Sequence, residues 1–433
     1  MAGWVRTRRD SKAGVSFVEL SDGSCPKTLQ LVVPRELPNY ETEVLRLGVG
    51  ASLVAKGLLV PSVGKGQAFE LQVEELQVLG NSDPDAYPLQ KKRHSFEFLR
   101  SIPHLRVRTN TFGAMARLRS KLAWEIHRFF QERGFFYVNT PIITPNDCEG
   151  AGELFKVSRG GDASGGEFFG RPAYLTVSGQ LELEAYALAL GKVYTFGPTF
   201  RAEDSNTTRH LAEFWMVEPE VAFMDLKGDI ELAKEFLTHI FAYVLDKERE
   251  ELLQFERWVT PGLISQLEST TEKPFTVITY TEAINALKMS KETFQYPVEW
   301  GLNLQTEHER YLSEVYIKGP VVVIDYPKVI KPFYMKLNPD EKTVRAMDVL
   351  LPRWGEIIGG SEREDDLSVL EFRMDELGMN KSQYWWYLDL RRYGSAPHSG
   401  FGLGFERLLL YLTGLGNIRD TIPYPRTPNQ MVV

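Results

Sequence analysis

The first 80 residues alternate between apolar and polar positions in short runs, a pattern that predicts β-strands rather than helices. The runs are rich in β-branched and aromatic residues, and turn sequences such as Ser-Asp-Gly-Ser at 21–24 separate most of them. Five strands are predicted, at 4–9, 16–20, 28–33, 52–60 and 69–79, with a helix-like segment at 40–47 between the third and the fourth.

Five strands with a helix after the third are arranged in the order of an OB β-barrel, a fold that often binds single-stranded nucleic acid. Many small barrels bind something else, so the order alone leaves the ligand open. We assign residues 1–80 to this barrel and residues 81–110, which open on a polar, proline-containing stretch, to a linker.

An amphipathic helix is predicted from about 111 to 133, with Asn110 or Thr111 as its cap and Gly134 as its stop. Beyond it the pattern shows no regular alternation of strand and helix, which favours an antiparallel sheet flanked by helices over a parallel one. The predicted class is α+β, with a second domain at 111–433. A polar, glycine-rich insert at 158–170 receives no function.

Composition limits the functional classes. No apolar run reaches the roughly 20 residues of a membrane helix, so we expect no membrane partner. Two distant cysteines, Cys25 and Cys148, suggest neither a disulfide framework nor a zinc site, and we expect a cytoplasmic protein. The net charge of −8 argues against indiscriminate nucleic-acid binding, although basic residues cluster at 6–12 and 91–93.

The segment 194–223 contains two apolar runs around a polar loop, which predicts a long hairpin. Arg201 and Glu203 are expected at the end of its first strand and on the same face, because side chains alternate along a strand. A cross-sheet ion pair would also explain these two residues. Arg209 and His210 lie at the far side of the loop.

Glycines at 400, 402 and 404 precede Arg407 and an apolar helix. Their spacing differs from a dinucleotide-binding fingerprint. We interpret them as a strand that passes close beneath a ligand while the helix presents Arg407.

Together these segments resemble the class II aminoacyl-tRNA synthetases. The matching motifs are the helix and strand ending at Pro141, the Arg-x-Glu hairpin at Arg201, and the glycine-rich strand with Arg407. Within the class, RHLAEFWMVEPE and SGQLELEAYA resemble the asparaginyl-tRNA synthetases, and the resemblance covers almost the whole chain. It implies activation of L-asparagine by ATP and transfer to tRNA(Asn).

The resemblance also implies roles in ATP binding. Arg201 would hold the α-phosphate and the attacking carboxylate, and Arg407 would fix the γ-phosphate; these two are the expected catalytic residues. Glu203 would face the adenine amino group and Phe214 would stack on the ring, with Arg209 and His210 at the outer phosphates. The family's Mg²⁺ ligands match Asp348 and Glu356, and a solvated strand end remains the alternative for Asp348.

For the amino acid, the resemblance implies that Glu149, Ser178 and Gln180 meet the ammonium group. Arg363 matches the arginine that grips the side-chain oxygen in aspartyl and asparaginyl relatives. Glu218 accepts from an amide NH₂ but repels a carboxylate. Aspartyl relatives carry a lysine where this chain has Leu183, which also favours asparagine.

In the family the barrel grips the anticodon. Alignment of FVEL, TLQL and AFELQV with that fold implies contacts from Phe17, Gln30 and Glu70, with Arg6 and Arg8 nearby; Phe17 would also suit the barrel core. Relatives usually carry further residues before Gly3, so we expect a clipped first strand and altered tightness of anticodon binding.

Three rival interpretations remain. One is an aspartyl-tRNA synthetase, another is an asparagine synthetase-like paralogue, and the third is a non-catalytic tRNA-binding protein on the same scaffold. Leu183 and Glu218 oppose the first, the barrel opposes the second, and the complete set of motif residues opposes the third. The segment ending at Pro141 also resembles the one that builds the class's two-fold dimer, so a homodimer is expected.

Overall fold

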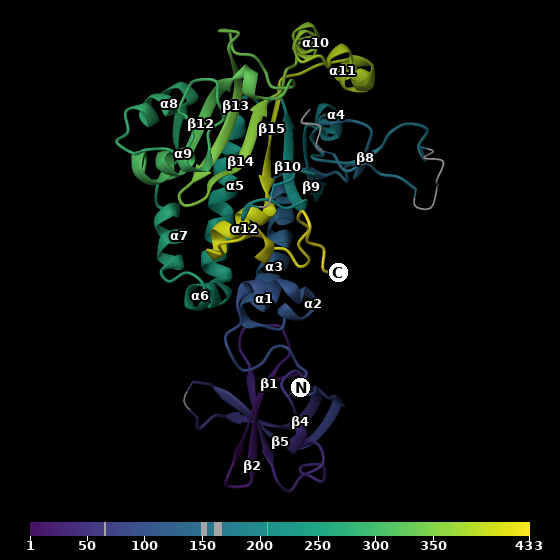
Figure 1. Cartoon of the computed structure of the whole chain (residues 1–433), viewed down its shortest axis with the longest axis vertical. Coiled ribbons are helices and arrows are strands. Elements are labelled where there is room, and N and C mark those ends of the chain that lie inside the picture. Colours follow the sequence, from purple (N-terminus) through teal and green to yellow (C-terminus); the bar gives the residue numbers. More distant parts are fainter. Residues whose placement is uncertain (65, 149–153, 160–166, 206) are drawn as a thin grey trace. The chain divides into compact units, whose positions relative to one another are not determined.

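The computed structural model describes residues 1–433 except 65, 149–153, 160–166 and 206. Its chain divides into two compact units, residues 1–118 with 432–433, and residues 119–431. The division falls inside a long helix, so that helix contributes to both units. Each unit is described separately below (Figure 1).

The first unit begins with a closed five-stranded barrel in the order β1-β2-β3-β5-β4. Burial alternates along β2, so Val18 and Leu20 are fully buried while Phe17 and Glu19 are partly exposed. The predicted helix at 40–47 is reduced to turns and one short 3₁₀ segment, Val44–Arg46. The strands are β1 Ala2–Ser11, β2 Val15–Ser21, β3 Leu29–Pro34, β4 Ser52–Pro61 and β5 Phe69–Gly80.

Three helices follow the barrel: α1 Phe96–Ser101, α2 Pro103–Arg106 and α3 Asn110–Glu132. Thr109, one residue earlier than the predicted caps, accepts the Phe112 N–H at 3.4 Å at the start of α3. Gly134, at φ +77°, follows the end of α3 as predicted.

The second unit is built on an eight-stranded sheet in the order β11-β12-β13-β14-β15-β10-β9-β6. Neighbouring strands are antiparallel except for β11–β12 and β6–β9, which confirms the predicted α+β class. The strands are β6 Phe136–Tyr137, β9 Lys192–Phe200, β10 Glu213–Ala222, β11 Thr276–Thr279, β12 Val321–Pro327, β13 Thr343–Leu351, β14 Gly355–Glu362 and β15 His398–Gly404; β7 Ile143–Thr144 and β8 Tyr174–Leu175 form a separate pair.

Helices cover this sheet (Figure 1), with α5 packed against β14 and β15, and α8 against β12. Asp225 caps α5 by accepting the Gly228 N–H at 2.9 Å, and a Thr279–Glu282 capping box starts α8. The helices are α4 Gln180–Leu190, α5 Leu226–Lys247, α6 Arg249–Trp258, α7 Leu263–Thr271, α8 Tyr280–Lys288, α9 Thr306–Arg310, α10 Leu367–Glu376, α11 Trp385–Arg392 and α12 Phe405–Thr413; a π-helical turn, Tyr311–Tyr316, continues α9, and 3₁₀ turns occupy Lys328–Ile330, Lys381–Tyr384 and Ile418–Asp420.

The glycines of β15 make room for side chains of its neighbour β10. A Cβ added at Gly400 would lie 2.3 Å from Glu220 Cδ, and one at Gly402 would lie 2.6 Å from Met216 Cε. At Gly400 the backbone oxygen of Pro219 would also lie 2.3 Å away, which excludes any side chain there, whereas at Gly402 the flexible end of Met216 would have to move. The glycine-rich strand therefore lets charged and flexible side chains of β10 lie across the sheet.

Candidate active site

The predicted hairpin is formed by β9 and β10, with Thr199 opposite Phe214. Arg201 lies just beyond the end of β9, where its N–H donates to Ala212 O at 3.0 Å. The Arg201 guanidinium carbon lies 5.3 Å from the centre of the Phe214 ring. The structure therefore places these two predicted residues in contact across the hairpin.

The hairpin loop brings further basic side chains to the same region. His210 lies 3.7 Å from Glu203, and burial lowers the pKa of His210, helped by the nearby charges of Arg407, Arg201 and Arg209. Arg209 donates from Nη1 to Trp354 O at 2.8 Å and to Thr306 Oγ1 at 3.0 Å. Positive charge from separate segments therefore converges here, as a polyphosphate would require.

Two carboxylates face a glycine on the neighbouring strands. Asp348 on β13 is paired in register with Gly359 on β14. A Cβ added at Gly359 would lie 3.5 Å from Asp348 Oδ1 and 3.2 Å from Glu356 Oε1, so both oxygens border the small space that this glycine leaves open. Asp348 is not a solvated strand end, because its side chain is only 16% exposed and lies in mid-strand.

Basic residues and a third carboxylate surround this pair. Arg407, in the first turn of α12, donates to Glu356 Oε2 at 3.4 Å. Burial by itself would raise the pKa of Glu356, but the positive charges of Arg407, Lys331 and Arg201 outweigh this effect and lower it. Glu309 accepts the Glu356 N–H at 3.1 Å, and burial raises its pKa to about 7. Neither Glu309 nor Lys331 lies in a periodic pattern or motif of the sequence that could have identified it.

A second set of side chains lies at the start of α4. Glu218 on β10 accepts the Ser178 hydroxyl and, at 3.1 Å, the Gly179 N–H. Gln180 is buried beside them, and its N–H donates to Ser178 Oγ at 3.1 Å. The structure thus brings together Ser178, Gln180 and Glu218, whereas Glu149 lies outside the described residues, as does part of the 158–170 insert.

Arg363 is 2% exposed and binds the fully buried Glu220 through Nη2 and, at 3.3 Å, through Nε. Its Nη1 donates to Ser361 Oγ at 2.7 Å. Burial raises the pKa of Glu220 to about 7, despite the opposing charge of Arg363. This carboxylate, which sequence reasoning missed, partly neutralises the predicted side-chain-binding arginine.

Glu184 extends the same buried network. It accepts from Arg391 at 2.8 Å, from His398 at 2.9 Å and from Gln180 at 3.1 Å. Burial opposes its charge, but Arg391 and His398 outweigh this effect and lower the pKa of Glu184. Nothing in the sequence separated Glu184 from an ordinary helix glutamate, because its partners come from distant segments.

Leu183 is fully buried in an apolar cluster with Val138, Ala187 and Val193. Its position therefore supplies no positive charge to the network around Arg363 and Glu218.

In the barrel, Phe17 is partly exposed on β2 and lies outside the core. Gln30 on β3 donates to the buried Glu70 on β5 at 3.3 Å, so these two predicted residues are in contact. Arg8 bonds Val44 O at 2.9 Å, and Arg6 bonds Asn110 Oδ1 at 2.5 Å.

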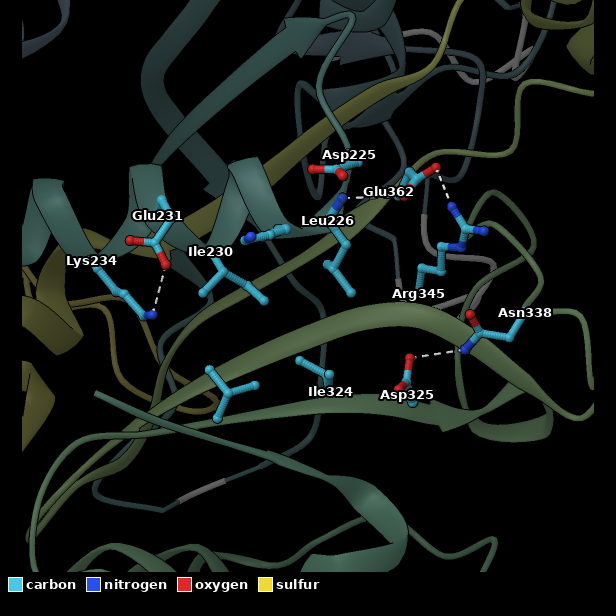
Figure 2. A pocket seen from close by; sticks show the side chains of 12 residues that line it. Asp225, Leu226, Ile230, Glu231, Lys234, Ile324, Asp325, Asn338, Arg345 and Glu362 are labelled. Carbon is cyan, nitrogen blue, oxygen red and sulfur yellow. Dashed lines mark hydrogen bonds and ion pairs between the residues drawn. The ribbon is translucent and has the colours of Figure 1, made fainter. Parts of the chain in front are cut away.

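A separate pocket lies beside the start of α5 (Figure 2). Four of its charged side chains form ion pairs, Lys234 with Glu231 at 2.9 Å and Arg345 with Glu362 at 2.8 Å. It contains none of the predicted site residues.

Among the described residues, no helix is long and apolar enough to cross a membrane. Within the same part of the chain, no group of three or more histidine, cysteine, aspartate or glutamate side chains is arranged to hold a metal ion. A Mg²⁺ ion held by Asp348 and Glu356 would therefore have to complete its coordination with water or with substrate oxygens.

Residues 96–428 match the family described as tRNA synthetases class II (D, K and N). The chain belongs to this family. Residues 1–79 match the OB-fold nucleic acid binding domain, which confirms the predicted barrel. The class II synthetase motifs recognised in the sequence thus lie in the unit that carries the carboxylates and arginines described above.

Relatives and solved structures of the family are similar over nearly the full chain. Asparagine--tRNA ligase from Myxococcus xanthus is 59% identical, covering 98% of this chain and 94% of its own, and the protein of that name from Hahella chejuensis is 56% identical, covering 99% and 94%. A crystal structure of asparaginyl-tRNA synthetase from Pyrococcus horikoshii complexed with asparaginyl-adenylate matches at a TM-score of 0.89 with 36% identity, covering 100% of this chain and 95% of that one. These comparisons confirm the resemblance to asparaginyl-tRNA synthetases.

Proposed function

We propose that this class II synthetase is an asparagine–tRNA ligase. The carboxylate of L-asparagine attacks the α-phosphorus of ATP, the bond to the β-phosphate breaks and pyrophosphate leaves. The 3′-terminal ribose hydroxyl of tRNA(Asn) then takes the asparaginyl group and AMP leaves. The buried Glu218 carboxylate beside Ser178 and Gln180 carries this proposal, together with relatives of that name that are 59% and 56% identical.

The charges and positions of the side chains around the hairpin suggest which part of ATP each would bind. Arg201 would hold the α-phosphate and orient the attacking carboxylate, and Arg407 would hold the γ-phosphate. Arg209 and His210 would meet the outer phosphates, because these basic groups already converge near the hairpin loop. Phe214 would stack on adenine with Glu203 at its amino group.

Asp348 and Glu356 fit a Mg²⁺ ion, because their oxygens border the one space that Gly359 leaves open and phosphate oxygens would complete the coordination. When bound, Mg²⁺ would neutralise charge on the phosphates. The arginine side chains would meanwhile align the amino-acid carboxylate with the α-phosphate.

Amino-acid choice rests on charge, because asparagine and aspartate have nearly the same shape. Glu218 would accept from the amide NH₂ and repel a carboxylate, and Arg363 would donate to the side-chain oxygen. Glu220 reduces the net positive charge of Arg363, which further disfavours aspartate. Ser178, Gln180 and Glu149 would bind the ammonium group.

For the tRNA, we assign the anticodon to the barrel, with Phe17, Gln30, Glu70, Arg6 and Arg8 as its contacts; the partly exposed Phe17 offers a ring for stacking. A homodimer acting in the cytoplasm completes the proposal. Domain limits of 1–80, 81–110 and 111–433 remain our working division.

The test is ATP–pyrophosphate exchange with the purified chain, with asparagine and with aspartate in separate reactions. Exchange that depends on asparagine supports the proposal. Exchange driven by aspartate alone would instead point to an aspartyl-tRNA synthetase or to an asparagine synthetase-like paralogue. A tRNA-charging assay distinguishes these two, because only the synthetase transfers the amino acid to tRNA.

A further inference from the structure

Lys331 is bound to the proposed metal ligand Asp348. Its Nζ lies 3.0 Å from Oδ1 and 2.9 Å from Oδ2 of that carboxylate. The side chains are only 15% and 16% exposed, so the pair is largely shielded from solvent. An ammonium placed evenly between both oxygens occupies the position from which a cation neutralises this carboxylate most effectively.

The surrounding chain holds Lys331 in this position. The residue follows the 3₁₀ turn Lys328–Ile330 and precedes Pro332, which favours the extended backbone observed at φ −126° and ψ 151°. Nζ lies 3.9 Å from the centre of the Tyr326 ring. The Tyr326 ring and the Asp348 carboxylate together therefore form a receptor for the ammonium.

The second carboxylate has a basic partner of the same kind. Arg407 binds Glu356 at 3.4 Å, and Glu356 borders the same space over Gly359 as Asp348. The two carboxylates are thus neutralised by two separate side chains, Lys331 and Arg407. One divalent cation bound between the carboxylates would replace both positive charges and release both side chains.

We propose that Lys331 holds the place of a divalent cation at Asp348 and moves to an oxygen of the ATP polyphosphate when Mg²⁺ takes that carboxylate. The proposal rests on the function proposed above. Lys331 suits this exchange because its compact charge sits on a flexible four-carbon chain, which can turn from one oxygen to another without moving the backbone. Lys331 is therefore a further substrate-binding residue, in contact with Asp348 before ATP arrives and with phosphate afterwards.

This exchange predicts opposite effects on two binding reactions. Mg²⁺ alone must displace Lys331, so Lys331→Met should tighten Mg²⁺ binding to the nucleotide-free protein by about tenfold or more. The same variant loses a charge-assisted bond to phosphate and should bind Mg²⁺ with α,β-methylene-ATP about tenfold more weakly. A purely structural role would weaken both reactions.

Both affinities are measured by isothermal titration calorimetry on the full chain. Lys331→Arg keeps the charge and should leave Mg²⁺ affinity near that of the unmodified protein. Lys328→Met is the matched control, because Lys328 lies three residues away and pairs with Glu376 at 3.0 Å instead. Weaker or unchanged Mg²⁺ binding in Lys331→Met would overturn the proposal.

A second measurement needs no variant. Reductive methylation followed by mass spectrometry reports the accessibility of each lysine in the unmodified chain. Lys331 should be methylated faster when Mg²⁺ alone is added and more slowly when the ATP analogue follows, while Lys328 stays constant. A rate for Lys331 that Mg²⁺ does not change would contradict the exchange. Absence of asparagine-dependent exchange would refute the proposed function without altering this result.

Discussion

Arg363 and Glu220 form an ion pair that is almost completely buried, with Nε of the arginine 3.3 Å from Oε2 of the glutamate. Glu184 lies 4.0 Å from the same guanidinium. Removing one partner of a buried pair leaves an uncompensated charge, so this arrangement fixes both the direction and the net charge of Arg363. The buried Glu220 and Glu184 therefore set the electrostatics of Arg363 in the proposed amino-acid site.

Arg363→Lys should raise KM for asparagine by about tenfold to a hundredfold, because a lysine cannot bind Glu220, Ser361 and a substrate oxygen in the same planar geometry. KM for ATP should change little. Arg345→Lys is the matched control, since Arg345 lies on β13 and pairs with Glu362 at 2.8 Å. Steady-state pyrophosphate exchange measures both constants; equal increases in the two KM values would argue against this role.

Phe17→Ala should weaken tRNA binding by about tenfold through the loss of base stacking. Amino-acid activation should stay unchanged, because Phe17 belongs to the barrel. Filter binding with tRNA(Asn) measures the affinity, and Leu58→Ala, at a 63% exposed position on β4, controls for loss of any exposed apolar side chain of the barrel. Equal affinity in the two variants would exclude Phe17 as a contact.

Stability should depend on pH through Glu182. Burial raises the pKa of this side chain to about 7, whereas an unfolded glutamate titrates near 4.3. Between these pH values the folded state binds more protons, so the free energy of unfolding falls as pH rises toward 7. The glutamine of Glu182→Gln stays neutral and can still accept the Thr144 hydroxyl, so the free energy of unfolding of this variant does not fall with pH through this position.

The free energy of unfolding of Glu182→Gln, relative to the unmodified protein, should therefore increase by about 1–3 kcal/mol between pH 5 and pH 8. Urea denaturation followed by circular dichroism at each pH measures it. Glu268→Gln removes an exposed ion pair with Arg249 and should show no such trend. If the free energies of unfolding of Glu182→Gln and of the unmodified protein changed with pH in parallel, Glu182 would not be the source of the pH dependence.

A homodimer is expected from the segment that ends α3 and enters β6. Phe136, Tyr137 and Ile142 are 56%, 43% and 42% exposed there, an apolar surface suited to a partner. Light scattering should give twice the chain mass of 49.4 kDa. Phe136→Asp should shift the mass toward one chain, while Phe372→Asp, on a 55% exposed residue of α10, should not. A mass of 49.4 kDa for the unmodified protein would rule out the dimer.

Features with local signals were predictable from the sequence. Alternation along 16–20 located β2, and the glycines at 400 and 402 indicated a close approach, although the structure shows that Glu220 and Met216 fill the space they leave. The helix expected at 40–47 shrank to a single 3₁₀ turn, because tertiary packing overrides helix propensity in so short a segment.

Features that depend on distant residues were not predictable. Glu184, Arg391 and His398 meet only because α4, α11 and β15 are brought together by the fold. Lys331 lies in a connection with no periodic pattern, and its importance follows from its distance to Asp348 alone. Motif residues such as Arg201 indicate adenylate chemistry, whereas the choice of amino acid depends on the buried charges around Glu218 and Arg363.

The most direct test of asparagine selection is tRNA charging in competition. The purified chain, Mg²⁺, ATP and a tRNA(Asn) transcript are mixed with asparagine and aspartate at equal concentrations, and mass spectrometry identifies the amino acid on the 3′-terminal ribose. We expect asparaginyl-tRNA, with an increased share of aspartyl-tRNA when Glu218→Gln removes a repulsion worth up to about 4 kcal/mol. Aspartyl-tRNA as the main product of the unmodified chain would contradict this expectation.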